Sequence, residues 1–191
     1  FECIYFVFTA VSKNFMLFPF FFVIICFLLL QEDIHCIKVD MVLRPLLWLE
    51  TALQVMTKYP QDQYVSLGVP TWLYGHEPAT PFATHIAKYF DNSIREDSIL
   101  TIAKGGIIYS PGSAGTMQEI FQEAVQNHYL SFGYASPMIF MNKHYWTDEM
   151  PVYRLMQHLI EKGKYKNLLM TLTDSTEEIV KTILEFREGI Q

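Results

Sequence analysis

The chain has no glycine in its first 67 residues, although glycine occurs nine times in the whole sequence. Turns that bind phosphate need glycine, because it adopts left-handed backbone conformations and lets a ligand approach the main chain closely. A Gly-rich strand–turn–helix anion site is therefore excluded from residues 1–67. Any such site has to lie further along the chain.

Cysteine and positive charge are also scarce. The three cysteines all lie within the first 36 residues, and none has the paired spacing of a zinc or redox site. The remaining chain therefore has no disulfide framework, which fits a reducing compartment such as the cytoplasm. The net charge is −6, from 14 basic and 20 acidic residues, with no basic run. This balance argues against a nucleic-acid-binding surface.

An apolar block dominates the N-terminus. Phe15–Leu30 carries no charged residue and is broken only by Pro19. It is shorter than the roughly twenty residues of a membrane-spanning helix and is closer to the core of a signal peptide. Three interpretations stay open: an artefactual extension with Met41 as the true start, a membrane anchor, or a cleaved signal. We therefore separate an extension, 1–40, from a domain, 41–191.

Short apolar strands alternate with amphipathic helices after residue 40. This alternation predicts an α/β fold with a parallel sheet and helices on both faces. The expected helices are 41–59, 82–103, 116–129, 152–162 and 176–186, and the expected strands are 64–69, 107–109, 137–141 and 168–172.

A glycine-rich turn separates the predicted strand 107–109 from the helix predicted to begin at Thr116. Such a turn leaves backbone N–H groups and the positive end of a helix dipole available to an anion, most often phosphate. The expected phosphate-binding residues are Gly112, Ser113, Ala114, Gly115 and Thr116. A purely structural interpretation is that Thr116 caps the helix and Glu119 completes a capping box. The two interpretations are compatible.

The run Pro-Gly-Ser-Ala-Gly-Thr-x-x-Glu, residues 111–119, resembles the Pro-Gly-Gly-x-Gly-Thr-x-x-Glu signature of the LOG ("lonely guy") family. These Rossmann-like phosphoribohydrolases cleave the N-glycosidic bond of nucleoside 5′-monophosphates, and many were once labelled lysine decarboxylases. The similarity covers roughly residues 64–186, with Ser113 in place of the second glycine. It implies a homodimer, no metal or redox cofactor, and a fold whose N-terminal Gly-rich part is missing here.

The resemblance also assigns catalytic roles. Cleavage of an N-glycosidic bond builds positive charge on the ribose, which a carboxylate can stabilise. Glu119 is the expected catalytic carboxylate, and Arg95 matches, with a one-residue adjustment, an arginine that the family carries upstream of its motif. The alternative for Arg95 is a solvated helix residue paired with Asp91.

Other candidate residues lie in the loop 71–81, at the expected carboxyl ends of the strands. The possible base contacts are Trp72, Tyr74 and His76. His76 and Glu77 lack the second histidine that a zincin helix requires, so no metal site is expected. Lys104 has no feature of a Schiff-base lysine. The rival hypotheses are a nucleotide-binding module without catalysis and a membrane-anchored nucleotide sensor.

Overall fold

The computed structural model describes residues 43–58, 65–70 and 80–189, with side chains from residue 49 onward. The extension 1–40 and the loop residues Trp72, Tyr74 and His76 lie outside these ranges. The chain divides into two compact units, with the boundary between Arg95 and Glu96. Both units contain a small parallel sheet, so the α/β class expected from the sequence is confirmed for the part of the chain that the structure describes.

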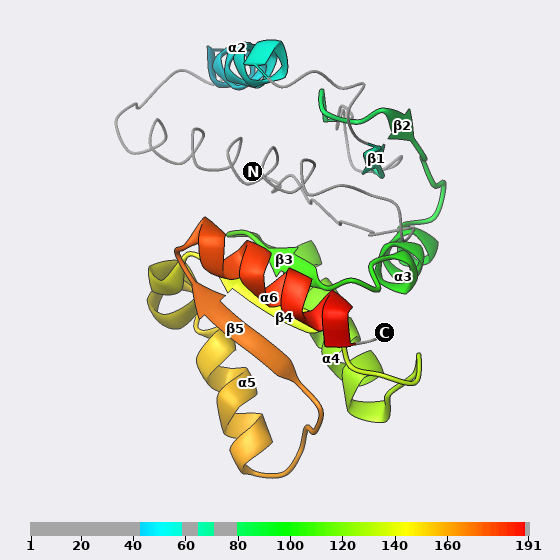
Figure 1. Ribbon diagram of the computed structural model, residues 1–191, viewed down its shortest axis with the longest axis vertical. Coiled ribbons are helices and arrows are strands. Elements are labelled where there is room, and N and C mark those ends of the chain that lie inside the picture. Colours follow the sequence, from blue (N-terminus) through cyan, green and yellow to red (C-terminus); the bar gives the residue numbers. More distant parts are fainter. Residues whose placement is uncertain (1–42, 59–64, 71–79, 190–191) are drawn as a thin grey trace. The chain divides into compact units, whose positions relative to one another are not determined.

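The second unit is built on three parallel strands in the order β3-β4-β5. Helix α4 connects β3 to β4, a π-helical turn η2 and helix α5 connect β4 to β5, and α6 follows β5 (Figure 1). The bounds are β3 Ile107–Tyr109, α4 Ala114–Tyr129, β4 Pro137–Met141, η2 Tyr145–Glu149, α5 Val152–Glu161, β5 Leu169–Thr173 and α6 Thr176–Gly189. The strands predicted here are correct to within one residue.

The two faces of this sheet carry different apolar side chains. Tyr109, Phe140 and Leu172 are in register across the three strands and therefore share one face. That face packs into a core with Ile120 of α4 and Met156 of α5, which are fully buried. α6 packs on β4 and β5 and crosses β4 in Figure 1. The fully buried Ile139 of β4 points to the opposite face from Phe140, which α6 covers with Ile179 and Ile183, both also buried. Helices on both faces explain why β4 is buried at every position.

The first unit contains α2 (Leu43–Lys58), the short strands β1 (Leu67–Gly68) and β2 (His85–Ile86), and the start of α3 (Asn92–Ile102). The helix predicted over 41–59 is confirmed for residues 43–58. The strand predicted over 64–69 is reduced to two residues, which pair in parallel with β2. The pairing is extended by Thr84, whose hydroxyl accepts a hydrogen bond from the Ser66 N–H at 2.9 Å and donates one to the Ser66 carbonyl at 3.0 Å.

The helix predicted over 82–103 is wrong in its first half. α3 begins at Asn92 because Asp91 caps it: the Asp91 carboxylate accepts the Ser93 N–H at 2.9 Å, and the Asp91 carbonyl accepts the Arg95 N–H at 3.1 Å. The apolar face expected along this helix is largely exposed, since Ile86, Phe90 and Ile94 are 61%, 72% and 56% accessible. Tertiary pairing of Thr84 with Ser66 has overridden the helical pattern.

Three helix ends in the second unit have recognisable local geometry. Leu130 follows α4 in the left-handed conformation (φ 51°), and its N–H donates to the Asn127 carbonyl. Gly163 (φ +66°) follows α5. Ser175 caps α6, with its hydroxyl accepting the Glu178 N–H at 3.2 Å.

In the described ranges no helix has the length and apolar character needed to cross a membrane.

Candidate functional site

The glycine-rich turn leads from β3 directly into α4. The helix starts at Ala114, two residues earlier than expected, and its first internal hydrogen bond runs from the Met117 N–H to the Ser113 carbonyl at 3.1 Å. Within the helix, the N–H groups of Ala114 and Gly115 have no carbonyl to bond. Ser113 and Ala114 are exposed and Gly115 is half-buried. The residues that carry these donors, at the positive end of the α4 dipole, are therefore accessible to solvent.

Gly112 is required by its neighbour in the helix. A Cβ at Gly112 would stand 1.9 Å from the Thr116 hydroxyl oxygen and 2.8 Å from the Thr116 Cβ. Thr116 is itself only 1% exposed, so its side chain is packed directly over the Gly112 backbone. The glycine makes room for the first turn of α4, and this close approach holds the turn against the helix.

The capping box expected from Thr116 and Glu119 is wrong. The N-cap is Ser113, whose side chain makes no capping hydrogen bond, and Thr116 is the third residue of the helix. Glu119 is the sixth, too far along for its carboxylate to return to the N-cap. The capping role that rivalled catalysis for Glu119 is thereby removed.

One face of α4 carries polar side chains into the interior. They recur at three- and four-residue intervals, none is more than 3% exposed, and they are Thr116, Glu119, Glu123 and Asn127. Asn127 pairs with the backbone of Ser136, donating to its carbonyl at 3.0 Å and accepting its N–H at 2.8 Å. The Ser136 hydroxyl donates to the Glu123 carboxylate. The inward face of α4, where apolar residues are usual, is therefore a row of hydrogen-bonded polar side chains, which we call the polar seam.

Tyr109, the last residue of β3, borders this seam. Burial raises the pKa of its phenol well above the ordinary value, and the nearby carboxylates of Glu123 and Glu119 add to the rise. Its hydroxyl has no hydrogen-bond partner among the described residues. Tyr109, Glu119 and Glu123 thus form one buried polar cluster, in which charge is poorly screened and electrostatic effects are strong.

Burial also raises the pKa of Glu123, against the opposing effect of the Ser136 and Asn127 hydrogen bonds. Between the unfolded-state and native pKa values the native state binds more protons. The free energy of unfolding therefore falls as the pH rises from about 4.5, the ordinary value, and stops falling above the native pKa.

We expect Glu123→Gln to flatten this pH slope and to be more stable than the wild type at pH 7. The amide oxygen can still accept from Ser136, but the side chain cannot ionise. Denaturant unfolding at pH 4.5, 5.5 and 7 measures the effect. If the stability difference between variant and wild type is the same at every pH, Glu123 is not the source of the pH dependence.

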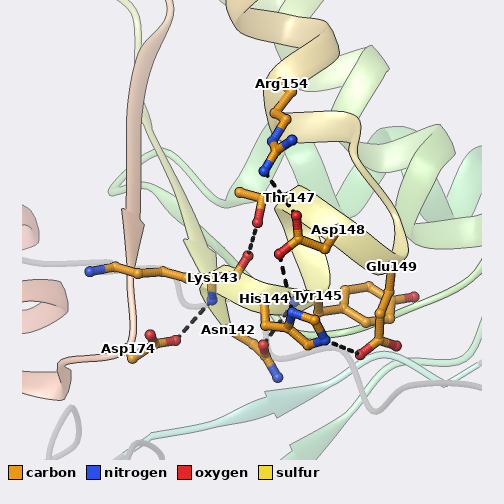
Figure 2. A network of polar contacts seen from close by, with 9 residues as sticks. All are labelled: Asn142, Lys143, His144, Tyr145, Thr147, Asp148, Glu149, Arg154 and Asp174. Carbon is orange, nitrogen blue, oxygen red and sulfur yellow. Dashed lines mark hydrogen bonds and ion pairs between the residues drawn. The ribbon is translucent and has the colours of Figure 1, made fainter.

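The carboxyl ends of the three strands are linked by side chains that the sequence analysis did not single out, and Figure 2 shows those that follow β4 and β5. Asn142 follows β4 with φ +81°, and its amide oxygen accepts the Tyr145 N–H at 3.0 Å. The Asp174 carboxylate, after β5, accepts the Lys143 N–H at 2.8 Å. The Tyr145 hydroxyl donates to the Gly112 carbonyl, which joins this edge to the glycine-rich turn. Asn142, an asparagine directly after a predicted buried strand, was the sequence feature that could have indicated these linking residues.

A second, exposed group of ionisable side chains borders this edge in Figure 2. His144 lies 3.1 Å from Asp148 and 3.4 Å from Glu149, and Arg154 bonds Asp148 at 2.8 Å. The hydrogen bond from His144 is the main cause that lowers the pKa of Asp148. These side chains are about half exposed or more, so each pair contributes little to stability. Among the described residues, no group of three or more His, Cys, Asp and Glu side chains is arranged so that it could hold a metal ion.

Arg95 lies in the first unit and is 3% exposed, so the alternative of a solvated side chain paired with Asp91 is wrong. Its guanidinium donates to the Asn92 side-chain oxygen at 3.0 Å and to the Val69 carbonyl at 3.1 Å. These bonds tie the first turn of α3 to the residue after β1.

Lys104, in the second unit, has its ammonium 4.8 Å from the Phe132 ring centre, an ordinary cation–π contact.

Comparison of the chain with protein-family models matches no family, and comparison with curated proteins gives no significant match. The class of protein is therefore defined by its architecture: an α/β protein with a strand–Gly turn–helix unit at the carboxyl edge of a parallel sheet. In α/β sheets this edge is the usual place for ligands.

Proposed function

We propose that the chain is a LOG-type phosphoribohydrolase that hydrolyses nucleoside 5′-monophosphates to a free base and ribose 5-phosphate. One observation carries the proposal: the solvent-facing start of α4 is followed, little more than one turn later, by the buried carboxylate of Glu119, which has no capping role. A phosphate is stabilised by backbone donors at a helix N-terminus, and a developing ribosyl cation is stabilised by a carboxylate. The sequence resemblance of residues 111–119 supports the same assignment.

In this proposal the turn 112–116 binds the 5′-phosphate through backbone N–H groups and the α4 dipole. The ribose then extends toward Glu119. As the glycosidic bond breaks, positive charge grows on C1′, and the Glu119 carboxylate stabilises it or orients the attacking water. The low-dielectric surroundings of Tyr109 and Glu123 strengthen that interaction. The water oxygen bonds to C1′ as the bond to the base breaks, and the proton that the water loses is balanced by the one that the leaving base takes up. No metal or redox cofactor takes part in the proposed reaction.

Arg95 is the second residue to which we assign a role, that of positioning the nucleotide. This assignment rests on the sequence resemblance; within the first unit the Arg95 side chain is buried and donates to the Val69 carbonyl. The base contacts Trp72, Tyr74 and His76 remain part of the proposal by resemblance, as does a cytoplasmic location, where nucleotides are available.

We also propose that the protein acts as a homodimer. In the first unit Phe90 and Ile94 are exposed on and beside α3, and in the second unit Val125 and Tyr129 are exposed on α4. Self-association that covers these side chains would remove their apolar area from water, which is favourable. Light scattering at micromolar concentration measures it, and a strictly monomeric mass would contradict the dimer.

The rival is a nucleotide-binding module without catalysis, and one assay separates the two. Purified protein is incubated with AMP or CMP, and the free base and ribose 5-phosphate are quantified, with adenosine and cytidine as phosphate-free controls. We expect base release from the monophosphates and little from the nucleosides. Binding of AMP without base release would favour the rival. If the protein neither binds AMP nor releases the base, both hypotheses are contradicted.

A further inference from the structure

Tyr145 connects two loops that are 33 residues apart in the chain, because its hydroxyl donates to the carbonyl of Gly112. The tyrosine is well held at its base. Its N–H donates to Asn142, and its ring meets Trp146 edge-on with the ring centres 4.9 Å apart. The Trp146 indole in turn donates to the Met141 carbonyl at 2.8 Å. The hydroxyl therefore reaches Gly112 from a side chain that is packed against the buried Trp146.

The orientation of one peptide follows from this bond. In a planar trans peptide the carbonyl and the following N–H point in opposite directions. When Tyr145 holds the Gly112 carbonyl, the Ser113 N–H has to point the other way. A peptide that begins at a glycine flips more easily than others because glycine tolerates many backbone conformations. Without the Tyr145 hydroxyl, this peptide would lose its directional restraint.

We propose that Tyr145 is a positioning residue: its hydrogen bond to Gly112 fixes the Ser113 N–H toward the open side of the turn, and so sets the affinity for the phosphate group. The proposal rests on the function proposed above. Three observations converge on it: the bond itself, the exposure of Ser113, and the Thr116 side chain that packs closely over Gly112. A flipped peptide would aim a carbonyl oxygen at the anion and repel it.

Tyr145→Phe tests this inference, because it removes the hydroxyl and keeps the ring that packs on Trp146. Tyr153→Phe is the matched control: it deletes a hydroxyl from another half-buried tyrosine of the same core, whose ring packs on Phe140 with the centres 5.2 Å apart. Affinities for inorganic phosphate, AMP and adenosine are measured by calorimetry. The Ser113 amide is followed by NMR with and without phosphate, and thermal unfolding confirms that each variant is folded.

We expect Tyr145→Phe to weaken binding of phosphate and AMP about three- to tenfold, the value of one hydrogen bond. Adenosine affinity should not change, and Tyr153→Phe should bind as the wild type does. The Ser113 amide resonance should move in the ligand-free Tyr145→Phe protein. Unchanged AMP affinity, or equal losses for AMP and adenosine, would overturn the inference.

The two proposals fail in different ways. If the wild type binds neither phosphate nor AMP, the proposed function is wrong, and the Ser113 resonance alone judges the Tyr145 bond. A resonance that is the same in wild type and Tyr145→Phe would then show that the hydroxyl does not orient the peptide. That outcome overturns the inference whatever the protein binds.

Discussion

Glu119→Gln should lower base release from nucleoside 5′-monophosphates by roughly a hundredfold or more while nucleotide binding persists. The amide has the same shape as the carboxylate but cannot supply negative charge to a ribosyl cation. Since Glu119 lies at the sixth position of α4 and does not cap the helix, the loss cannot be assigned to a lost cap. Steady-state kinetics with AMP or CMP should show the loss in kcat, with KM little changed.

A surface substitution of the same kind provides the control. Glu161→Gln, at the exposed end of α5, removes one charge without entering the buried cluster and should retain wild-type turnover. Thermal unfolding of both variants separates a catalytic loss from a folding defect. Wild-type rates of base release in Glu119→Gln would rule out this residue as the catalytic carboxylate.

Gly115→Val should abolish measurable binding of AMP and inorganic phosphate. Gly115 is the second residue of α4, and a helical Cβ tilts toward the N-terminus, so the valine methyl groups would occupy the space that the anion approaches. The helix itself should survive, because valine is no worse than glycine in a helix. The far-UV circular dichroism spectrum should therefore stay native, and calorimetry should show no binding heat.

Gly115→Ala should cause a smaller loss of AMP affinity than Gly115→Val. A single methyl group fills less of the approach, so we expect AMP affinity between those of the wild type and the valine variant. Adenosine serves as the phosphate-free ligand, and its binding should respond less than that of AMP. Unchanged AMP affinity in Gly115→Val would mean that the start of α4 is not the phosphate site.

Local patterns were sufficient for most of the second unit. β4 was correctly predicted from its five apolar residues, Pro137–Met141, because a central parallel strand is covered on both faces and has to be apolar throughout. Gly163 and Ser175 mark helix ends, because each has a local physical role that tertiary context left intact.

Two predictions failed because distant residues compete with local ones. The apolar spacing of Phe82, Ile86 and Phe90 suggested a helix, but Thr84 pairs with Ser66 eighteen residues earlier and draws the segment into a parallel strand. The Thr116–Glu119 spacing suggested a capping box. Thr116 packs over Gly112 instead, so the helix begins at Ala114 and both residues turn inward.

The sequence by itself determined the alternation of strands and helices, the glycine-rich turn and the candidate pair of phosphate donors and carboxylate, because each depends on residues close together in the chain. Only the tertiary structure decided where α4 begins, that Glu119 joins Tyr109 and Glu123 in a buried cluster, and that Tyr145 holds Gly112. These features depend on packing between β3, α4 and the loop after β4. Sequence periodicity describes one element at a time, and contacts between distant elements lie beyond it.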